Sequence, residues 1–184
     1  AAYLEAAGHQ VTLLRGEMST WQGRLPIGSV QSFSTGADLA DRLRRLAVSG
    51  ADAVFHAAAV SDFGVGQVCA RRPDGTLVRL EAGKFSTHQG TLWAELIPTA
   101  KILPRLREWF PSAKLVGWKY EVDGDLASAL RAGMAQLRAC RTDATVVNGP
   151  AYGPGFGLLT SDGRHVPLAD RAALYAALAA WLRV

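Results

Sequence analysis

A carboxylate follows an apolar, strand-like stretch at residues 53–55 and three consecutive alanines at residues 57–59. The alanines lead through Val-Ser to Asp62. Side chains this small let a ligand approach the backbone closely, and in an open α/β sheet ligands bind outside the carboxyl ends of the strands. Asp62 would then accept a hydrogen bond from a ligand amine or hydroxyl. The alternative is an alanine-rich strand packed under a helix, with Asp62 capping a turn.

A threonine and a lysine lie at the start of a helix that we predict for residues 98–110. Thr99 is a natural N-cap residue. The free N–H groups of a first helical turn attract anions, and the helix dipole adds about half a positive charge there. Lys101 in the same turn is disfavoured by this dipole, so a bound anion would account for it. These residues therefore indicate a site for an anionic ligand.

The segment at about residues 64–90 is longer than an ordinary connection, since loops beyond about 12–15 residues are uncommon and often functional. It contains a possible hairpin around Pro73-Asp74-Gly75. It also carries a basic excess, with Arg71, Arg72, Arg79 and Lys84 against Asp74 and Glu81. We interpret the segment as a flap or arm that covers the site of an anion. A solvent-exposed loop without function is the alternative.

Strands and helices alternate along the chain, and these elements must position the side chains above. Strand-like stretches lie at residues 10–14, 29–34, 53–55, 91–97, 114–119 and 143–148, with a hairpin signal at 158–168. Helical periodicity covers residues 36–48, 98–110, about 125–140 and 169–184. Thr35 or Gly36 would open the first of these helices, and Asp123 or Asp125 would cap the third. This order predicts an α/β protein with a mostly parallel sheet and helices on both faces. One edge of the sheet would then carry the side chains that follow or end four of the strands: Asp62, Thr99, Trp118, Lys119 and Asn148.

Composition describes an ordinary globular protein of 184 residues, with 49% apolar and 20% charged residues. We expect a single domain over residues 1–184. The net charge of +4 comes without the dense Lys/Arg stripe of a nucleic-acid binder, and no apolar run reaches the length of about 18 residues that spans a membrane. Cys69 and Cys140 lack metal-binding spacing. Neither a zinc site nor a disulfide framework is expected, and a reducing, cytoplasmic location is the default.

The first nine residues read as the end of a helix that is stopped by Gly8. A chain seldom begins inside a helix that has no cap. We therefore expect a strand and a turn upstream of Ala1.

Five short motifs follow one another in a characteristic order. They are Ala-Ala-Ala-Val-Ser-Asp-Phe at 57–63, Gly-Lys-Phe-Ser-Thr at 83–87, Thr-Ala-Lys-Ile at 99–102, Val-Gly-Trp-Lys-Tyr-Glu at 116–121 and Val-Asn at 147–148. In this order and spacing the chain resembles the phosphopantothenate–cysteine ligase family. The resemblance covers about residues 53–148, and the rest of the chain fits it to the end. The family makes phosphopantothenoylcysteine on the route to coenzyme A.

The resemblance implies a Rossmann-like three-layer sandwich, with a flap that also serves as a dimerisation arm. It implies a homodimer with sites near the interface, and neither a membrane nor a nucleic acid as partner. The reaction that it implies has two steps. The carboxylate of phosphopantothenate attacks the α-phosphate of CTP or ATP, which Mg²⁺ accompanies. The amine of cysteine then displaces the nucleoside monophosphate from the acyl-nucleotidyl intermediate.

The same motifs assign roles to individual residues by resemblance. Lys84 matches the family's phosphate-contacting lysine on the flap, and we take it as catalytic because a fixed cation stabilises charge that builds on phosphate oxygens. Asp62 matches a carboxylate that contacts the sugar or base of the nucleotide. Trp118 replaces a phenylalanine and would pack on the nucleotide or belong to the core. The other nucleotide-binding positions are His56, Ala57, Ala58, Thr99, Ala100, Lys101, Ile102 and Lys119, and Asn148 is assigned to substrate binding.

The chain also departs from the family. The Thr-Ser-Gly-Gly-Thr opening and the Asn-X-Ser-(Ser/Thr)-Gly-X-X-Gly turn are absent, and Ala100 stands where a proline is usual. A helix that usually carries a nucleotide-facing lysine has Gly133 and Met134 there. The main alternative is therefore a non-catalytic relative that pairs with itself through the arm. An NAD(P)-dependent oxidoreductase would need a Tyr-X-X-X-Lys pair, which none of the tyrosines provides, and the catalytic His and flavin motifs of the decarboxylase often fused to the ligase are not visible.

Overall fold

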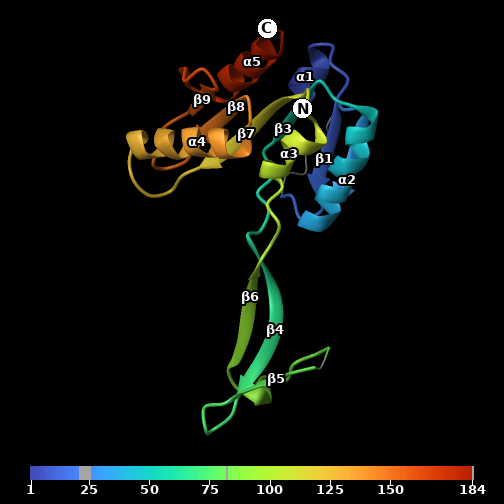
Figure 1. The fold of residues 1–184 in the computed structure, drawn as a ribbon, viewed down its shortest axis with the longest axis vertical. Helices are drawn as coiled ribbons and strands as arrows, with labels where there is room; N and C mark the ends of the chain where they lie inside the picture. Colours follow the sequence, from blue (N-terminus) through green and yellow to red (C-terminus); the bar gives the residue numbers. More distant parts are fainter. Residues whose placement is uncertain (21–25, 82, 184) are drawn as a thin grey trace. The chain divides into compact units, whose positions relative to one another are not determined.

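The computed structural model describes residues 1–20, 26–81 and 83–183. The chain forms two compact units. The body comprises residues 1–59 and 102–184, and the arm comprises residues 60–101. Figure 1 follows both units along the sequence. In the part of the chain that the structure describes, no helix has the length and apolar character needed to cross a membrane.

A five-stranded sheet forms the centre of the body, in the order β10-β9-β8-β7-β3. Its parallel part contains β3 (Ala53–His56), β7 (Lys114–Tyr120) and β8 (Ala144–Asn148). The antiparallel strands β9 (Phe156–Thr160) and β10 (His165–Leu168) continue it and form the predicted hairpin. β8 is almost wholly buried, which is typical of a parallel strand covered on both faces. The mostly parallel sheet that the sequence predicts is confirmed.

Helices cover both faces of this sheet, with α4 (Leu126–Cys140) on one and α5 (Arg171–Leu182) on the other (Figure 1). Val146 belongs to the core cluster that contains Leu178 of α5. Its neighbour Val147 belongs to the cluster that contains Leu137 of α4. Successive side chains of a strand point to opposite faces, so β8 holds both layers together. The predicted three-layer α/β arrangement is confirmed.

The N-terminal part of the body contributes a separate pair of parallel strands, β1 (Thr12–Gly16) and β2 (Ser29–Phe33). The short helix α1 (Ala2–Ala6) precedes them, and α2 (Gly36–Ser49) follows. The cap of α2 is Thr35, and of the two caps expected for α4 the structure has Asp125. The Thr35 hydroxyl accepts a hydrogen bond from the Asp38 N–H at 3.1 Å, and the Asp125 carboxylate accepts one from the Ser128 N–H at 2.8 Å.

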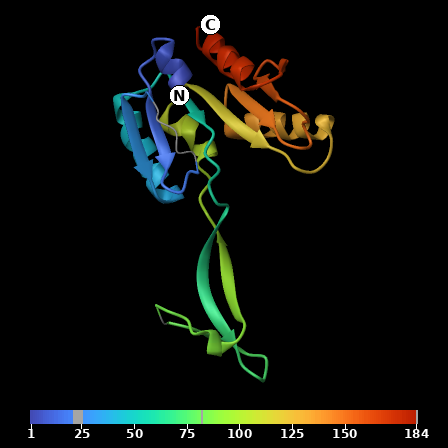
Figure 2. The same cartoon turned by 180° about the vertical axis from the view of Figure 1, so that it is seen from behind.

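The arm is an antiparallel sheet in the order β5-β4-β6, whose two long strands run side by side in Figure 2. β4 (Phe63–Arg71) and β5 (Leu77–Arg79) form the hairpin predicted around Pro73. The 3₁₀ helix η1 (Thr87–Gln89) precedes β6 (Leu92–Pro98), which pairs along β4. The strand predicted at residues 91–97 is present, but its expected place in the parallel sheet is wrong. Pairing with β4 closes a shorter loop than pairing with β3 and therefore costs less chain entropy than that alternative.

The helix predicted for residues 98–110 begins later than expected. The 3₁₀ helix η2 (Leu103–Arg105) leads into α3 (Leu106–Trp109). Pro104 gives the reason, since proline fits only the first turn of a helix, and a helix starting after Thr99 would place it in the interior. Thr99 is not an N-cap. Its role as the cap of an anion-binding helix N-terminus, and that of Lys101 as a first-turn residue, were wrong predictions.

Candidate functional site

Three predicted site residues lie at the carboxyl ends of two neighbouring strands of the body. Trp118 and Lys119 directly precede Tyr120, the last residue of β7, and Asn148 ends β8 opposite Tyr120 in the parallel register. The ammonium of Lys119 forms an ion pair with Oε1 of Glu121 at 2.8 Å, and both side chains are half-buried. An anion that binds at this edge would therefore compete with Glu121 for the lysine.

The backbone at this edge is fixed by hydrogen bonds between the two strand ends. The Glu121 N–H donates to the Asn148 carbonyl at 2.9 Å, and the Glu121 carbonyl accepts from the Ala151 N–H at 3.1 Å. Between them, Gly149 has a φ of +117°, and a Cβ there would lie 2.3 Å from the Glu121 carbonyl oxygen. Only glycine fits this position, which accounts for the Gly that follows Asn148 in the sequence.

Trp118 belongs to the structural layer beneath this edge. Its side chain packs against the core cluster of β7, β8 and α5, together with Phe55. Its carbonyl accepts a hydrogen bond from Nε2 of Gln136 in α4 at 3.1 Å. The half-buried ring thus has the core role that the sequence left open, and its contact with a nucleotide stays a prediction.

The end of β3 is built from small, accessible residues, as the sequence predicts. His56 pairs with Gly117 of β7 in the parallel register. Burial lowers the pKa of His56 below its ordinary value, so its imidazole is neutral at physiological pH. Ala57 and Ala58, which follow, are exposed. Their backbone is therefore open to a ligand at the carboxyl end of the strand.

In the arm, four residues meet where β4 begins and β6 ends. The Thr99 hydroxyl donates to the Ser61 carbonyl at 2.6 Å, and the Thr99 N–H donates to the Asp62 carbonyl at 2.9 Å. The Lys101 ammonium forms an ion pair with the Asp62 carboxylate, and both side chains are exposed. The structure thus brings Asp62, Thr99 and Lys101 together, although through the arm rather than through a shared sheet edge.

The remaining predicted positions are distributed between the two units. Lys84 and Ala100 lie in the arm and are exposed, and Lys84 has no ion-pair partner among the described residues. Ile102 lies in the body with only 5% of its surface exposed. Its side chain is part of the core, so only its backbone is available to a ligand.

Two contacts of the body edge were missed from the sequence. Glu121 stands two residues after Lys119, where side chains of a strand share a face, so the ion pair could have been expected. Gln136 lies 18 residues from Trp118, and no local pattern indicates that contact. Nowhere in the described segments do three His, Cys, Asp or Glu side chains gather closely enough to hold a metal ion.

Comparisons with known proteins give structural matches only. No family model matches the sequence, and no curated protein matches it. A DNA/pantothenate metabolism flavoprotein from Streptococcus pneumoniae has a TM-score of 0.74 at 18% identity, over 97% of this chain and 84% of that one.

Two further solved structures match. The C-terminal domain of the coenzyme A biosynthesis bifunctional protein CoaBC has a TM-score of 0.67 at 17% identity, over 99% of this chain and 81% of that one. A mutant of Cab2 in complex with phosphopantothenate-cysteine has a TM-score of 0.56 at 20% identity, over 84% of this chain and 54% of that one. The chain therefore has the fold of these three proteins.

Proposed function

We propose that this protein is a ligase that joins phosphopantothenate to cysteine through an acyl-nucleotidyl intermediate formed from CTP or ATP. The observation that carries the proposal is the fold match over nearly the whole chain to the CoaBC C-terminal domain, together with the five motifs at residues 57–148. The Cab2 complex with phosphopantothenate-cysteine agrees with this substrate class. Two free cysteines suit the reducing cytoplasm as its location.

The first step forms a bond between a carboxylate oxygen of phosphopantothenate and the α-phosphorus of the nucleotide. The bond from that phosphorus to the bridging oxygen breaks, and pyrophosphate leaves with the electron pair. Negative charge builds on the phosphate oxygens during this exchange, and fixed cations stabilise it. By the resemblance of its motif, Lys84 is the cation that we assign to this role. Mg²⁺ would arrive on the triphosphate, since the described residues offer no cluster of metal ligands.

In the second step, the cysteine amine attacks the acyl carbon. A C–N bond forms, the C–O bond to the nucleotide breaks, and the nucleoside monophosphate leaves, while the amine releases a proton to solvent. The exposed backbone at Ala57 and Ala58 supplies hydrogen-bonding groups for the intermediate, and the neutral imidazole of His56 adds no competing charge. We assign Asp62 to the sugar or base and Asn148 to the acid substrate.

We further propose that a second copy of the chain covers the arm. Val65 pairs with Leu96 and Phe63 with Pro98 in the antiparallel register, so all four side chains share one face. Phe63, Val65 and Leu96 are 51%, 69% and 62% exposed. An apolar face on so small a sheet needs a partner, and its lack of charge suits an identical face. Sedimentation of the protein and its Val65→Lys variant tests this, because a dimer that the variant splits supports it and a monomeric wild type contradicts it.

Product analysis tests the ligase activity. The purified protein is incubated with phosphopantothenate, cysteine, Mg²⁺ and either CTP or ATP, and products are measured by mass spectrometry. We expect phosphopantothenoylcysteine and one pyrophosphate per product with at least one nucleotide. Titration of CTP, ATP and NADPH by calorimetry separates the alternatives. Binding of NADPH without either triphosphate would favour an oxidoreductase, and binding of none of them a non-catalytic relative.

A further inference from the structure

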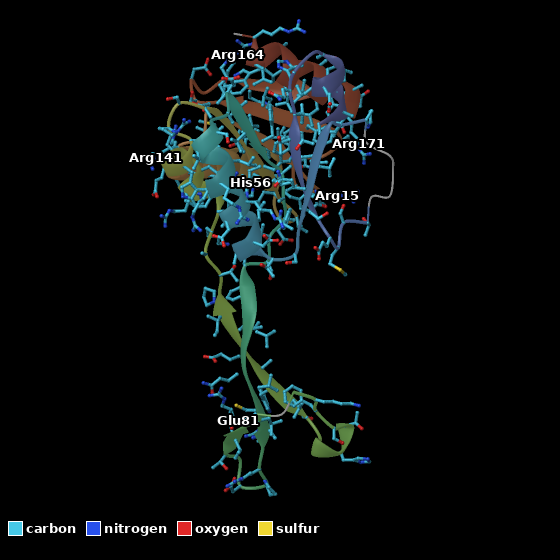
Figure 3. All side chains as sticks on the ribbon, turned by 90° about the vertical axis from the view of Figure 1, so that its right-hand side faces the viewer. Arg15, His56, Glu81, Arg141, Arg164 and Arg171 are labelled. Atoms are coloured by element: carbon cyan, nitrogen blue, oxygen red, sulfur yellow. The ribbon has the colours of Figure 1, made fainter. Side chains whose placement is uncertain are left out.

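Arg15 lies at the carboxyl end of β1, in a backbone that is fixed on both sides. It stands opposite Ser32 in the parallel register of β1 and β2. The next residues are held by hydrogen bonds, from the Glu17 N–H to the Phe33 carbonyl at 2.9 Å and from the Ser19 N–H to the Gly16 carbonyl at 3.0 Å. The position of the Arg15 side chain on the body is labelled in Figure 3. A fixed backbone presents this cation at a defined place.

The arginine differs from the other half-buried arginines in having no partner among the residues that the structure describes. Arg42 pairs with Asp38 at 2.9 Å, and Arg107 pairs with Asp143 at 2.7 Å. Arg15 is equally half-buried, yet the described residues offer it neither an ion pair nor a hydrogen bond. Removing a charge partly from water without a partner costs free energy. A ligand anion would offset this cost.

The half-buried lysines show the same contrast. Lys114 donates to the carbonyls of Trp181 and Leu182, each at 3.2 Å, and Lys119 pairs with Glu121. Among the half-buried cations of the described segments, Arg15 therefore stands apart.

The place of Arg15 in the fold is one where ligands bind. β1 and β2 form a parallel pair of their own, apart from the five-stranded sheet that contains β3. Ligands of open α/β proteins bind outside the carboxyl ends of parallel strands. Arg15 lies at this end of β1, and His56 lies at the same end of β3.

We infer that Arg15 binds a phosphate group of a ligand outside the carboxyl end of β1. The guanidinium presents paired N–H donors that match two phosphate oxygens, which a lysine does not reproduce. The inference rests on the proposed function for the choice of ligands. Two sources supply the same chemistry, namely the phosphate monoester of phosphopantothenate and the phosphates of the nucleotide.

Binding measurements on Arg15→Gln and Arg15→Lys test the inference, with Arg171→Gln as the matched control because Arg171 is exposed. Calorimetry gives Kd for phosphopantothenate, pantothenate, CTP and ATP, and thermal unfolding confirms that each variant is folded. We expect Arg15→Gln to weaken either phosphopantothenate or the nucleotides by about tenfold or more, Arg15→Lys to weaken the same ligand less, and pantothenate binding to stay unchanged. If only phosphopantothenate binds more weakly, Arg15 contacts its phosphate monoester. If only CTP or ATP binds more weakly, Arg15 contacts the phosphates of the nucleotide. Unchanged affinities, or equal losses in Arg171→Gln, overturn the inference.

Inorganic phosphate separates this inference from the proposed function. We expect the Arg15 Nε–H signal of the wild type to shift saturably in NMR spectra when phosphate is added. If that shift occurs but the wild type forms no phosphopantothenoylcysteine, the phosphate site stands and the ligase function fails. If the wild type forms product and Arg15→Gln binds every ligand as tightly, the ligase function stands and the phosphate site fails.

Discussion

Arg107 of α3 donates from Nη2 to Oδ2 of Asp143, which precedes β8, at 2.7 Å. The same carboxylate oxygen accepts the Leu115 N–H of β7 at 2.7 Å. The guanidinium also donates to the carbonyls of Arg141, Pro111 and Ala113. One arginine thus ties α3 to the starts of the two strands whose other ends form the candidate site.

Replacing Arg107 by alanine should destabilise the protein. Three carbonyls and one carboxylate lose a donor, and the bonds to Ala113 and Asp143 are partly buried. This should lower the free energy of unfolding by about 2–3 kcal/mol. Urea unfolding followed by circular dichroism measures this. Arg105→Ala is the control, because its pair with Glu108 is exposed and should contribute less than about 1 kcal/mol. Equal losses in both variants would show that Arg107 does not have this role.

Gly149→Ala should be much more disruptive than Gly153→Ala, although both glycines have positive φ. A Cβ at Gly149 meets the Glu121 carbonyl at 2.3 Å, whereas a Cβ at Gly153 meets nothing within 4 Å. Both variants carry the backbone strain of about 1–2 kcal/mol, and only Gly149→Ala adds a clash with backbone. We expect it to lower the unfolding midpoint further and to shift the NMR signals of Asn148 and Glu121. Indistinguishable midpoints and spectra would rule out the tight contact.

Stability should decrease on acidification because of His56. Burial lowers the pKa of this histidine in the folded state below its ordinary value of 6.5. The unfolded chain therefore binds its proton first as the pH falls, so folding is penalised below about pH 6.5 and not above. Unfolding measured between pH 8 and pH 5 should show a smaller loss of stability for His56→Gln than for the wild type. Parallel curves for the two proteins would mean that His56 is not the group responsible.

Lys84→Ala should weaken nucleotide binding if the arm lysine contacts phosphate. Lys84 is exposed, so its removal leaves the fold intact. We expect Kd for CTP or ATP to rise about tenfold, which is about 1.4 kcal/mol. Arg72→Ala removes another exposed cation of the arm and should change Kd less than about twofold. The same Kd in both variants would contradict the assignment of Lys84.

The elements with local signals were predictable from the sequence. Thr35 and Asp125 mark the starts of α2 and α4, and the apolar run before Asn148 marks the buried strand β8. These signals come from hydrogen bonds and periodicity within a few residues. The same signals show strands and helices alternating along the chain, and this alternation predicts the parallel sheet.

The partner of a strand, and the start of a helix where more than one residue could cap it, were not predictable from such local signals. β6 reads as a strand, but nothing within it indicates β4 rather than β7 as its partner. Thr99 has the chemistry of an N-cap, yet its hydroxyl is taken by the Ser61 carbonyl, 38 residues away in sequence. In the candidate site, motif order identified the strand ends, whereas the ion pair between Lys101 and Asp62 joins residues far apart in the sequence and depends on side-chain geometry that spacing alone does not give.

Isotope transfer tests the central claim most directly. Phosphopantothenate labelled with ¹⁸O in its carboxylate is converted with unlabelled nucleotide and cysteine, and the nucleotide products are analysed by mass spectrometry. An acyl-nucleotidyl intermediate predicts one ¹⁸O atom in the nucleoside monophosphate for each phosphopantothenoylcysteine formed. Label in inorganic phosphate together with a nucleoside diphosphate, or product without label in the monophosphate, would contradict the proposed mechanism.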